Sequence, residues 1–216
     1  MATMIPELSE AQLADLPSQA EAKVYHAFRD RLPADFVVFF QVGWILRREE
    51  EQAKDGETDF LVCHPDLGYL CVEVKGGGVG FDSHSGDWFS VDRHQHKHPI
   101  NNPINQALKA KYSIRSKLNE HQRWKDLALH NVLRGHAVFF PDVGNASDLS
   151  RPDMPATLIG CSKDLQSPKS WIDAAFAYWG NDASSFTALG RRGLDVLRDV
   201  FARSFVVTPL VSSQLA

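Results

Sequence analysis

Apolar positions near the N-terminus recur at the spacing of one face of a helix. The repeating residues are Val24, Phe28 and Leu32. Ser18 stands before this run and Glu21 follows three residues later, which is the S-x-x-E pattern of a capping box, while Pro33 cannot continue a helix. The pattern therefore predicts a helix over 18–32, preceded by an extended arm over 1–17.

The apolar runs that follow are typical of strands. Residues 35–44 are rich in β-branched and aromatic side chains, and so are residues 58–64 and 68–75. The segment HPDLG between the last two runs favours a hairpin turn centred on Asp66. We expect two shorter strands after this hairpin, in the segments GGGVGFD and DWFSVD.

The second half of the chain mixes helical and strand-like patterns. Pro103 suits the first turn of a helix that reads PINQALKAKYSIRSKLNEH, and residues 135–142 have the pattern of a buried strand. Further elements are expected as a strand over 155–160 and helices over 168–179 and 188–201. Residues 47–57 and the segment RHQHKHPINN are polar and predict loops. This order indicates an α/β fold, with a mixed β-sheet flanked by helices and a C-terminal, mainly helical annex.

Composition narrows the possible functions. The 216 residues suit one domain, or one domain with an appendage, and their net charge of −4 gives no overall attraction to nucleic acid. Any handling of DNA would therefore require a local basic surface and a divalent cation. Three cysteines do not make a disulfide framework, and the first residues lack the apolar centre of a secretory signal, so we expect a cytoplasmic protein. The missing GxxxxGK[ST] pattern excludes a Walker A ATPase loop from this chain.

Two charged residues interrupt the apolar run GYLCVEVK. Glu73 and Lys75 lie two residues apart and so share one face of the predicted strand. A hairpin centred on Asp66 places Asp59 directly opposite Glu73, where two like charges destabilise a sheet. Either these residues form an ion pair near a strand end, or a divalent cation removes the repulsion, because Mg²⁺ binds one or two carboxylates together with water and phosphate.

A cation held by two carboxylates beside a lysine suits the hydrolysis of phosphodiesters. The metal would lower the pKa of a water molecule and stabilise negative charge on the phosphate. Lys75 would orient or deprotonate that water, or neutralise the developing charge. The three glycines after Lys75 would leave room for a bulky backbone such as DNA.

Several spaced motifs extend this site into a family resemblance. The segments GETDFLVCHPDLGYLCVEVKGG, GDWFSVDR and HPINNPINQALKAKYSI together resemble the nuclease-related domain, NERD, which is similar to the PD-(D/E)XK nuclease superfamily. The resemblance runs from about Glu21 to Asp142. It implies that Asp59, Glu73 and Lys75 occupy the D…E-x-K positions.

The resemblance also implies a metal and supporting residues. Asp59 and Glu73, with the backbone carbonyl of Val74, would bind Mg²⁺ or Mn²⁺. Glu21 matches an acid that the superfamily often has on its first helix, although a capping box needs a glutamate there in any case. Gln106 matches the glutamine on the helix that follows the core strands.

The N-terminal segment and the motif GHAVFFPD resemble a subgroup of NERD proteins in which the domain precedes a helicase of the UvrD or DEAD-box type. No helicase lies in these 216 residues, so a helicase is expected as a separate or fused partner. The resemblance places the nuclease-like core at residues 18–142 and the annex or connector at 143–216.

One stretch of the chain is basic and lies on the helix that begins at Pro103. Lys109, Lys111 and Arg115 are the candidate contacts to nucleic-acid phosphates. The ordinary alternative for such residues is a solvated helix face.

These patterns support three hypotheses. The first is a Mg²⁺- or Mn²⁺-dependent nuclease that hydrolyses phosphodiester bonds in DNA alongside a helicase. The second is a non-catalytic module whose nuclease-like fold binds nucleic acid or docks a helicase, although a pure binder has no reason to keep two apposed carboxylates. The third is a protein-interaction annex over 143–216, with a surface formed by Trp171, Phe176 and Trp179.

Overall fold

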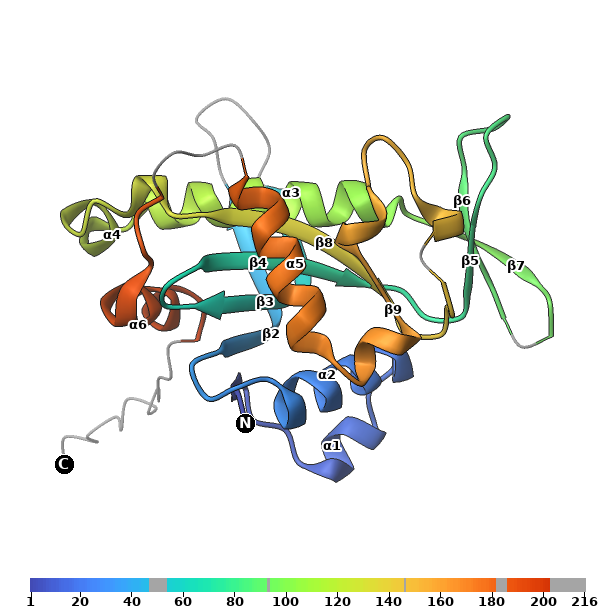
Figure 1. Ribbon diagram of the computed structural model, residues 1–216, viewed down its shortest axis with the longest axis horizontal. Coiled ribbons are helices and arrows are strands. Elements are labelled where there is room, and N and C mark those ends of the chain that lie inside the picture. The colour runs from blue at the N-terminus through green and yellow to red at the C-terminus, as the bar shows by residue number, and fades with distance from the viewer. Residues whose placement is uncertain (47–53, 93, 146, 182–185, 203–216) are drawn as a thin grey trace, which may run out of the picture.

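A six-stranded sheet forms the centre of the molecule (Figure 1). The computed structural model describes residues 1–46, 54–92, 94–145, 147–181 and 186–202. The strands lie in the order β1-β2-β3-β4-β8-β9. Their bounds are β1 (Thr3–Ile5), β2 (Val37–Leu46), β3 (Lys54–His64), β4 (Gly68–Val74), β8 (Arg134–Phe140) and β9 (Ile159–Cys161).

The sheet is mixed, as the sequence predicts. Strands β2, β3 and β4 are antiparallel neighbours, whereas β8 runs parallel to β4, β9 runs parallel to β8, and β1 runs parallel to β2. Every residue of β4 is buried. Such complete burial is typical of an interior strand covered on both faces, and it leaves little room for uncompensated charge.

Helices cover both faces of this sheet. One face packs against α2 (Gln19–Arg31) and α5 (Pro168–Gly180), with Phe40, Phe60 and Val72 among its buried residues. The opposite face, which includes Phe39, Leu61 and Cys71, packs against α3 (Pro103–Glu120) and α6 (Gly190–Phe201). Figure 1 shows α5 in front of the sheet and α3 behind it. The alternation of apolar residues along the strands supplies both layers.

A second, three-stranded sheet projects beyond the end of β4 (Figure 1). It consists of β5 (Gly78–Phe81), β6 (Trp88–Val91) and β7 (Lys97–Ile100). The prediction of a loop for RHQHKHPINN is therefore wrong in part, because β7 pairs with β6. The guanidinium of Arg151 lies 3.9 Å from the centre of the Phe81 ring and ties this sheet to the body of the protein.

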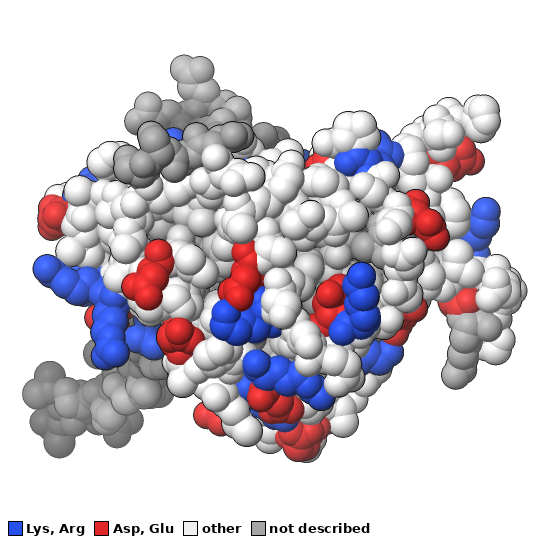
Figure 2. Space-filling view, in the orientation of Figure 1, with Lys and Arg blue, Asp and Glu red and all other residues white. Residues whose placement is uncertain are grey.

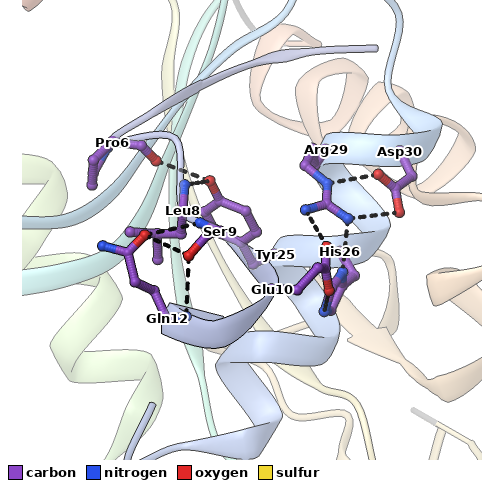
Figure 3. A network of polar contacts seen from close by, with 9 residues as sticks. All are labelled: Pro6, Leu8, Ser9, Glu10, Gln12, Tyr25, His26, Arg29 and Asp30. Carbon is purple, nitrogen blue, oxygen red and sulfur yellow. Dashed lines mark hydrogen bonds and ion pairs between the residues drawn. The ribbon is translucent and has the colours of Figure 1, made fainter. Parts of the chain in front are cut away.

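The N-terminal arm is more ordered than the sequence predicts. It contributes β1 to the large sheet and a short helix, α1 (Glu10–Ala14). Figure 3 shows how the arm is attached to α2: the Tyr25 hydroxyl donates to the Pro6 carbonyl and accepts from the Leu8 N–H, each at 2.9 Å. Arg29 also donates to Glu10 at 2.8 Å. These contacts explain why residues 1–17 do not form a free extended arm.

The C-terminal region is mainly helical, as predicted, and packs against the core. Strand β9 extends the large sheet, and Trp171 and Phe176 on α5 are buried in the same cluster as the residues of α2. The predicted interaction surface is therefore wrong for these two aromatic residues, and Trp179 is half-buried. Strand β9 and helix α5 thus pack with the large sheet, and the boundary at Asp142 stays a prediction.

Short elements connect the main ones. Residues 47–53 of the predicted loop at 47–57 lie outside the described residues, and the rest of that segment belongs to β3. The short helices are α4 (Gln122–Asp126) and 3-10 turns over Leu129–Asn131, Ser147–Leu149, Ala156–Leu158 and Ser162–Leu165.

Charges of both signs are mixed over the face that Figure 2 draws, without a broad field of one sign over α2 and α5. Within the described parts of the chain, no helix combines the length and the apolar character needed to cross a membrane.

Candidate active site

The hairpin of β3 and β4 has the register that the sequence predicts. Cys63 pairs with Tyr69, and Leu61 pairs with Cys71. The regular pairing stops one position later, at Phe60 and Val72. The acids Asp59 and Glu73 are the next residues along the two strands, so the register brings both to the point where the ladder opens.

Asp59 does not meet Glu73 as an ordinary cross-strand pair. Its Oδ2 atom instead accepts the backbone N–H of Val74 at 2.6 Å, so its side chain takes a place that a backbone carbonyl fills in a regular ladder. This contact holds the Asp59 carboxylate against the end of β4, beside Glu73. The two acids therefore converge, but through the backbone of Val74 rather than face to face.

Glu73 and Lys75 form a buried ion pair. The Lys75 Nζ atom donates to Glu73 Oε1 at 2.7 Å, and the Glu73 side chain is only 3% exposed. The Lys75 N–H donates to the Phe139 carbonyl at 3.1 Å, which ties this position to the neighbouring strand β8. The ion pair that the sequence analysis offered as one alternative is therefore present, and a third ionisable group, Asp59, lies beside it.

Burial changes the pKa values of the three charged groups in this cluster. Burial, followed by the negative charge of Glu73, raises the pKa of Asp59 to about 8, although the Val74 N–H opposes the shift. Burial also raises the pKa of Glu73 in spite of Lys75. For Lys75, burial favours the neutral amine, but the charge and hydrogen bond of Glu73, together with the charges of Asp59 and Glu21, outweigh burial and raise the pKa. The ammonium remains charged and balances one carboxylate, so Asp59 keeps its proton near neutral pH unless a further cation is bound.

Glu21 joins the same electrostatic cluster. Its negative charge contributes to the raised pKa values of Asp59 and Glu73. The Ser18 hydroxyl accepts the Glu21 N–H at 3.3 Å, while the Glu21 carboxylate accepts from Gln41 Nε2 at 3.2 Å. The cap of α2 therefore uses the backbone of Glu21, and its carboxylate is turned toward β2.

Two nearby residues were missed by sequence reasoning. The pairing of β2 with β3 skips one position, and the skipped residues are Gln41 and Asp59. Gln41 has a φ of 53°, a left-handed conformation that is uncommon for residues other than glycine. Glu57 lies two residues before Asp59, and its charge also contributes to the raised pKa of Glu73. The alternation of acids in GETDF was a usable signal for Glu57, whereas nothing in the sequence marks Gln41.

Gln106 supplies an oxygen that lacks a protein partner. It lies near the start of α3, which packs on β4 and β8. Its Oε1 atom is buried and has no hydrogen-bond partner among the described residues. A buried amide oxygen without a donor is unfavourable, so a ligand or a water molecule is expected to satisfy it.

The donor set fits a hard divalent cation in its chemistry. It offers carboxylates with too little positive charge around them and an amide oxygen without a donor, and Mg²⁺ and Mn²⁺ prefer oxygen ligands. In the described parts of the chain, however, no three His, Cys, Asp or Glu side chains are grouped closely enough to hold a metal. The ligand set of Asp59, Glu73 and the Val74 carbonyl therefore stays a prediction.

The candidate phosphate contacts on α3 differ from one another. Lys109 and Arg115 are exposed, whereas Lys111 is 7% exposed and its Nζ atom lies 4.2 Å from the centre of the Trp179 ring. Lys111 is therefore not part of a solvated helix face. Contact of Lys109 and Arg115 with nucleic acid stays a prediction.

The glycines after Lys75 serve the protein's own packing. A Cβ atom on Gly76 would lie 2.8 Å from the Ala20 Cβ atom, and one on Gly77 would lie 2.8 Å from the Val91 carbonyl oxygen. Gly77 also has a φ of 74° and donates its N–H to Asp142 at 2.8 Å. Close approach of the chain to itself, rather than open space for DNA, accounts for these two glycines.

Comparison with known protein families identifies the family of the chain. The family model described as the nuclease-related domain, NERD, matches residues 17–140, which is more than half of the chain. The chain belongs to the NERD family. Its NERD core has the element order α2-β2-β3-β4-α3-β8, interrupted by the small sheet, and this order is consistent with the PD-(D/E)XK superfamily. No curated protein and no solved structure gave a significant match to this NERD protein.

Proposed function

We propose that this NERD protein is a Mg²⁺- or Mn²⁺-dependent nuclease that hydrolyses phosphodiester bonds in DNA. The observation that supports the proposal best is the buried cluster at the end of β4. Asp59 and Glu73 share one nearby ammonium group, and burial raises the pKa of both carboxyls. A site that serves only stability gains little from two crowded buried acids, whereas a site that binds a divalent cation requires them.

Each residue of the cluster has a proposed role. Asp59 and Glu73, with the Val74 carbonyl, would hold the cation, which when bound would supply a water of lowered pKa and stabilise negative charge on the phosphate. Lys75, which already donates to Glu73, would orient the attacking water. Gln106 would offer its unpartnered oxygen to that water or to the cation. Glu21 would keep the cluster negative from the side of α2.

Cleavage assays on the full chain test this proposal. We expect the wild type to cut DNA with Mg²⁺ or Mn²⁺ and to stop when a chelator is added. Glu73→Gln keeps the shape of the buried side chain but removes its charge, so we expect cleavage to fall by about a hundredfold or more. Lys169→Ala breaks an exposed ion pair on α5 and is the matched control, expected to cut normally. Equal cleavage by wild type and Glu73→Gln would overturn the proposal.

We also propose that this nuclease works with a helicase. The support is the likeness of its N-terminal segment and of GHAVFFPD to NERD proteins that precede a helicase. A UvrD-type helicase with ATP should then increase cleavage of duplex DNA by this chain. If a helicase without ATPase activity increased the cleavage of duplex DNA equally, separation of the strands would not be the cause of the increase.

One observation favours a second function, a non-catalytic module that binds nucleic acid or docks a helicase. Glu73 is already paired with Lys75, and the described residues include no group of three acidic, histidine or cysteine ligands placed to hold a metal. Titration calorimetry with Mn²⁺ separates the two functions. Absence of heat and of cleavage, together with measurable DNA binding, would favour the non-catalytic module.

A further inference from the structure

A small basic cavity lies between α3 and the start of β8, outside the cluster at the end of β4. Its volume is about 250 Å³. The cavity is lined by Lys111, Tyr112, Arg115, Arg134 and Phe186. All of its polar lining side chains except the tyrosine are cations, and no acid among the described residues lines it.

The three cations of this cavity, of which Lys111 is buried and Arg115 is exposed, have no acidic partner among the described residues. Among the residues that the structure describes, Lys111, Arg115 and Arg134 form no ion pair with a carboxylate, and Arg134 donates only to the Val132 carbonyl, at 3.3 Å. Burial lowers the pKa of Lys111, and the positive charge of Arg134 acts in the same direction. Three cations gathered without an anion repel one another, and a bound anion would relieve that repulsion.

Aromatic side chains gather at the same place. Tyr112 is 52% exposed and Phe186 is 36% exposed, and both are among the few exposed large apolar residues of the described chain. Lys111 Nζ lies 5.0 Å from the centre of the Tyr112 ring and 4.2 Å from that of Trp179. The Tyr178 ring, also exposed, packs edge-on against Trp179 at 5.5 Å. Exposed rings beside unpaired cations are the combination that binds single-stranded nucleic acid, by stacking and charge.

We propose that this cavity binds one nucleotide of a single DNA strand, with the phosphate on Lys111, Arg115 and Arg134 and the base on Tyr112 or Phe186. The volume is smaller than that of pockets for larger ligands, about 300–1,000 Å³, which suits a single nucleotide unit. An acidic peptide would use the cations but not the exposed rings. The choice of nucleic acid as the ligand rests on the proposed function.

The cavity lies toward the start of β4, on the same strand as the acids. Arg134, which lines it, pairs with Tyr69, four residues before Glu73 and about 13 Å from it along the strand. The cavity therefore occupies the odd-numbered face of the sheet that α3 covers, upstream of the acids along β4. A strand held there would be positioned to run along α3 toward the two acids.

Binding measured without cleavage tests this inference. We would follow the fluorescence anisotropy of a short labelled oligothymidine with the full chain in chelator. We expect Arg115→Ala and Tyr112→Ala each to weaken binding roughly tenfold, since one aromatic stack or one charged contact has about this effect. Both side chains are exposed, so the variants should fold, and circular dichroism melting would verify this. The control is Lys163→Ala, an exposed cation beside β9, expected to bind as wild type.

The salt dependence separates the two contributions. Arg115→Ala should reduce the slope of log affinity against log salt concentration by about 0.7, because one phosphate contact is lost, whereas Tyr112→Ala should leave the slope unchanged. If the ligand is a DNA strand, thymidine monophosphate should compete only weakly with the labelled oligothymidine. If the ligand is a free nucleotide, thymidine monophosphate should compete as well as an unlabelled oligonucleotide does. The second result would overturn the assignment to a strand.

Three other results would overturn the inference. They are unchanged binding by both variants, a weakening by Lys163→Ala equal to theirs, and equal competition by polyglutamate. The inference and the proposed function fail separately. If Glu73→Gln loses cleavage, and binding is weakened by Arg115→Ala and Tyr112→Ala, both the nuclease and the binding cavity are supported. If the wild type shows the same pattern of binding but never cuts DNA, only the nuclease activity is contradicted.

Discussion

Two clusters in this protein each contain two carboxylates and one strong base, and they behave in opposite ways. On the surface, Arg29 donates to Glu10 at 2.8 Å and to Asp30 at 2.7 Å (Figure 3), and the hydrogen bond from Arg29 lowers the pKa of Asp30. At the end of β4, Lys75 lies with Asp59 and Glu73, yet burial raises the pKa of both acids. Charge count alone therefore does not determine the outcome.

The difference is one of solvation. Water around the surface cluster screens the repulsion between its acids, so one guanidinium is sufficient. In the buried cluster the desolvation of each carboxylate adds to their mutual repulsion, and one ammonium is not sufficient. The surface cluster is complete as it stands, whereas the buried cluster is expected to be completed by a cation.

The largest difference should appear when each cluster loses its base. Lys75→Met removes the group proposed to orient the attacking water, so we expect DNA cleavage to fall by about 10²–10⁴-fold. Arg29→Met removes the base of the surface cluster and should leave the cleavage rate unchanged. Initial rates with Mn²⁺, measured on variants whose melting shows that they fold, would check this. Equal rates for Lys75→Met and wild type would remove that lysine from the mechanism.

Addition of a cation should affect only the buried cluster. At Mn²⁺ concentrations about a hundredfold above the dissociation constant, we expect wild-type unfolding to become harder by about 2.7 kcal/mol. Because the pKa of Asp59 is about 8, binding near neutral pH should release about one proton, which calorimetry in two buffers of different ionisation enthalpy detects. Asp59→Asn should lose both effects, and Asp30→Asn should keep both. Proton release by Asp59→Asn would place the cation elsewhere.

The two clusters should also give opposite pH dependence in chelator. The raised pKa of Asp59 means that its contribution to stability is present below the unfolded value of 3.8 and is lost as the pH rises through about 8. The lowered pKa of Asp30 means that its contribution is present above 3.8 and is lost as the pH falls.

Urea unfolding measures this contrast. Asp59→Asn should equal wild type below about pH 4 and exceed it progressively as the pH rises, by on the order of several kcal/mol above about pH 8. Asp30→Asn should be less stable than wild type by under about 1 kcal/mol at neutral pH, and equal to it in acid. If both variants followed the same pH trend, burial would not be the cause of the difference.

The smallest effect concerns Gln41, which orients Glu21 at the edge of the buried cluster. Gln41→Ala and Gln41→Gly both remove the amide that donates to Glu21, so each should slow cleavage by about 2- to 10-fold. Glycine accepts a φ of 53° without strain, so Gln41→Gly should be more stable than Gln41→Ala by about 1 kcal/mol. Equal stability of the two would show that the left-handed conformation is not retained in the variants.

Local patterns predicted much of this fold and the centre of its site. The turn HPDLG fixed the register of β3 with β4, and two-residue alternation put Glu73 and Lys75 at the end of a buried strand. Strand β7 escaped prediction because KHPI is polar and contains a proline, and only pairing with β6 makes it a strand.

What sequence reasoning could not reach depends on contacts between distant segments. Lys111 is buried beside Trp179, which lies far along the chain, whereas the local pattern predicted a phosphate contact or a solvated helix face. The opening of the ladder at Asp59 depends on the unusual backbone of Gln41 on a neighbouring strand. Both are tertiary effects that override local preference.

The tight glycine turn after Lys75 has a consequence for the shape of the whole molecule. Gly76 is packed against α2 and Gly77 against β6, and Asp142 accepts the Gly77 N–H while its carboxylate pairs with Lys23. These contacts fix the direction in which the chain leaves β4 and enters the small sheet, beside the acids. A side chain at Gly76 or Gly77 would come within 2.8 Å of the Ala20 Cβ atom or the Val91 carbonyl oxygen, so either substitution should displace the small sheet and change the outline of the protein next to the acids.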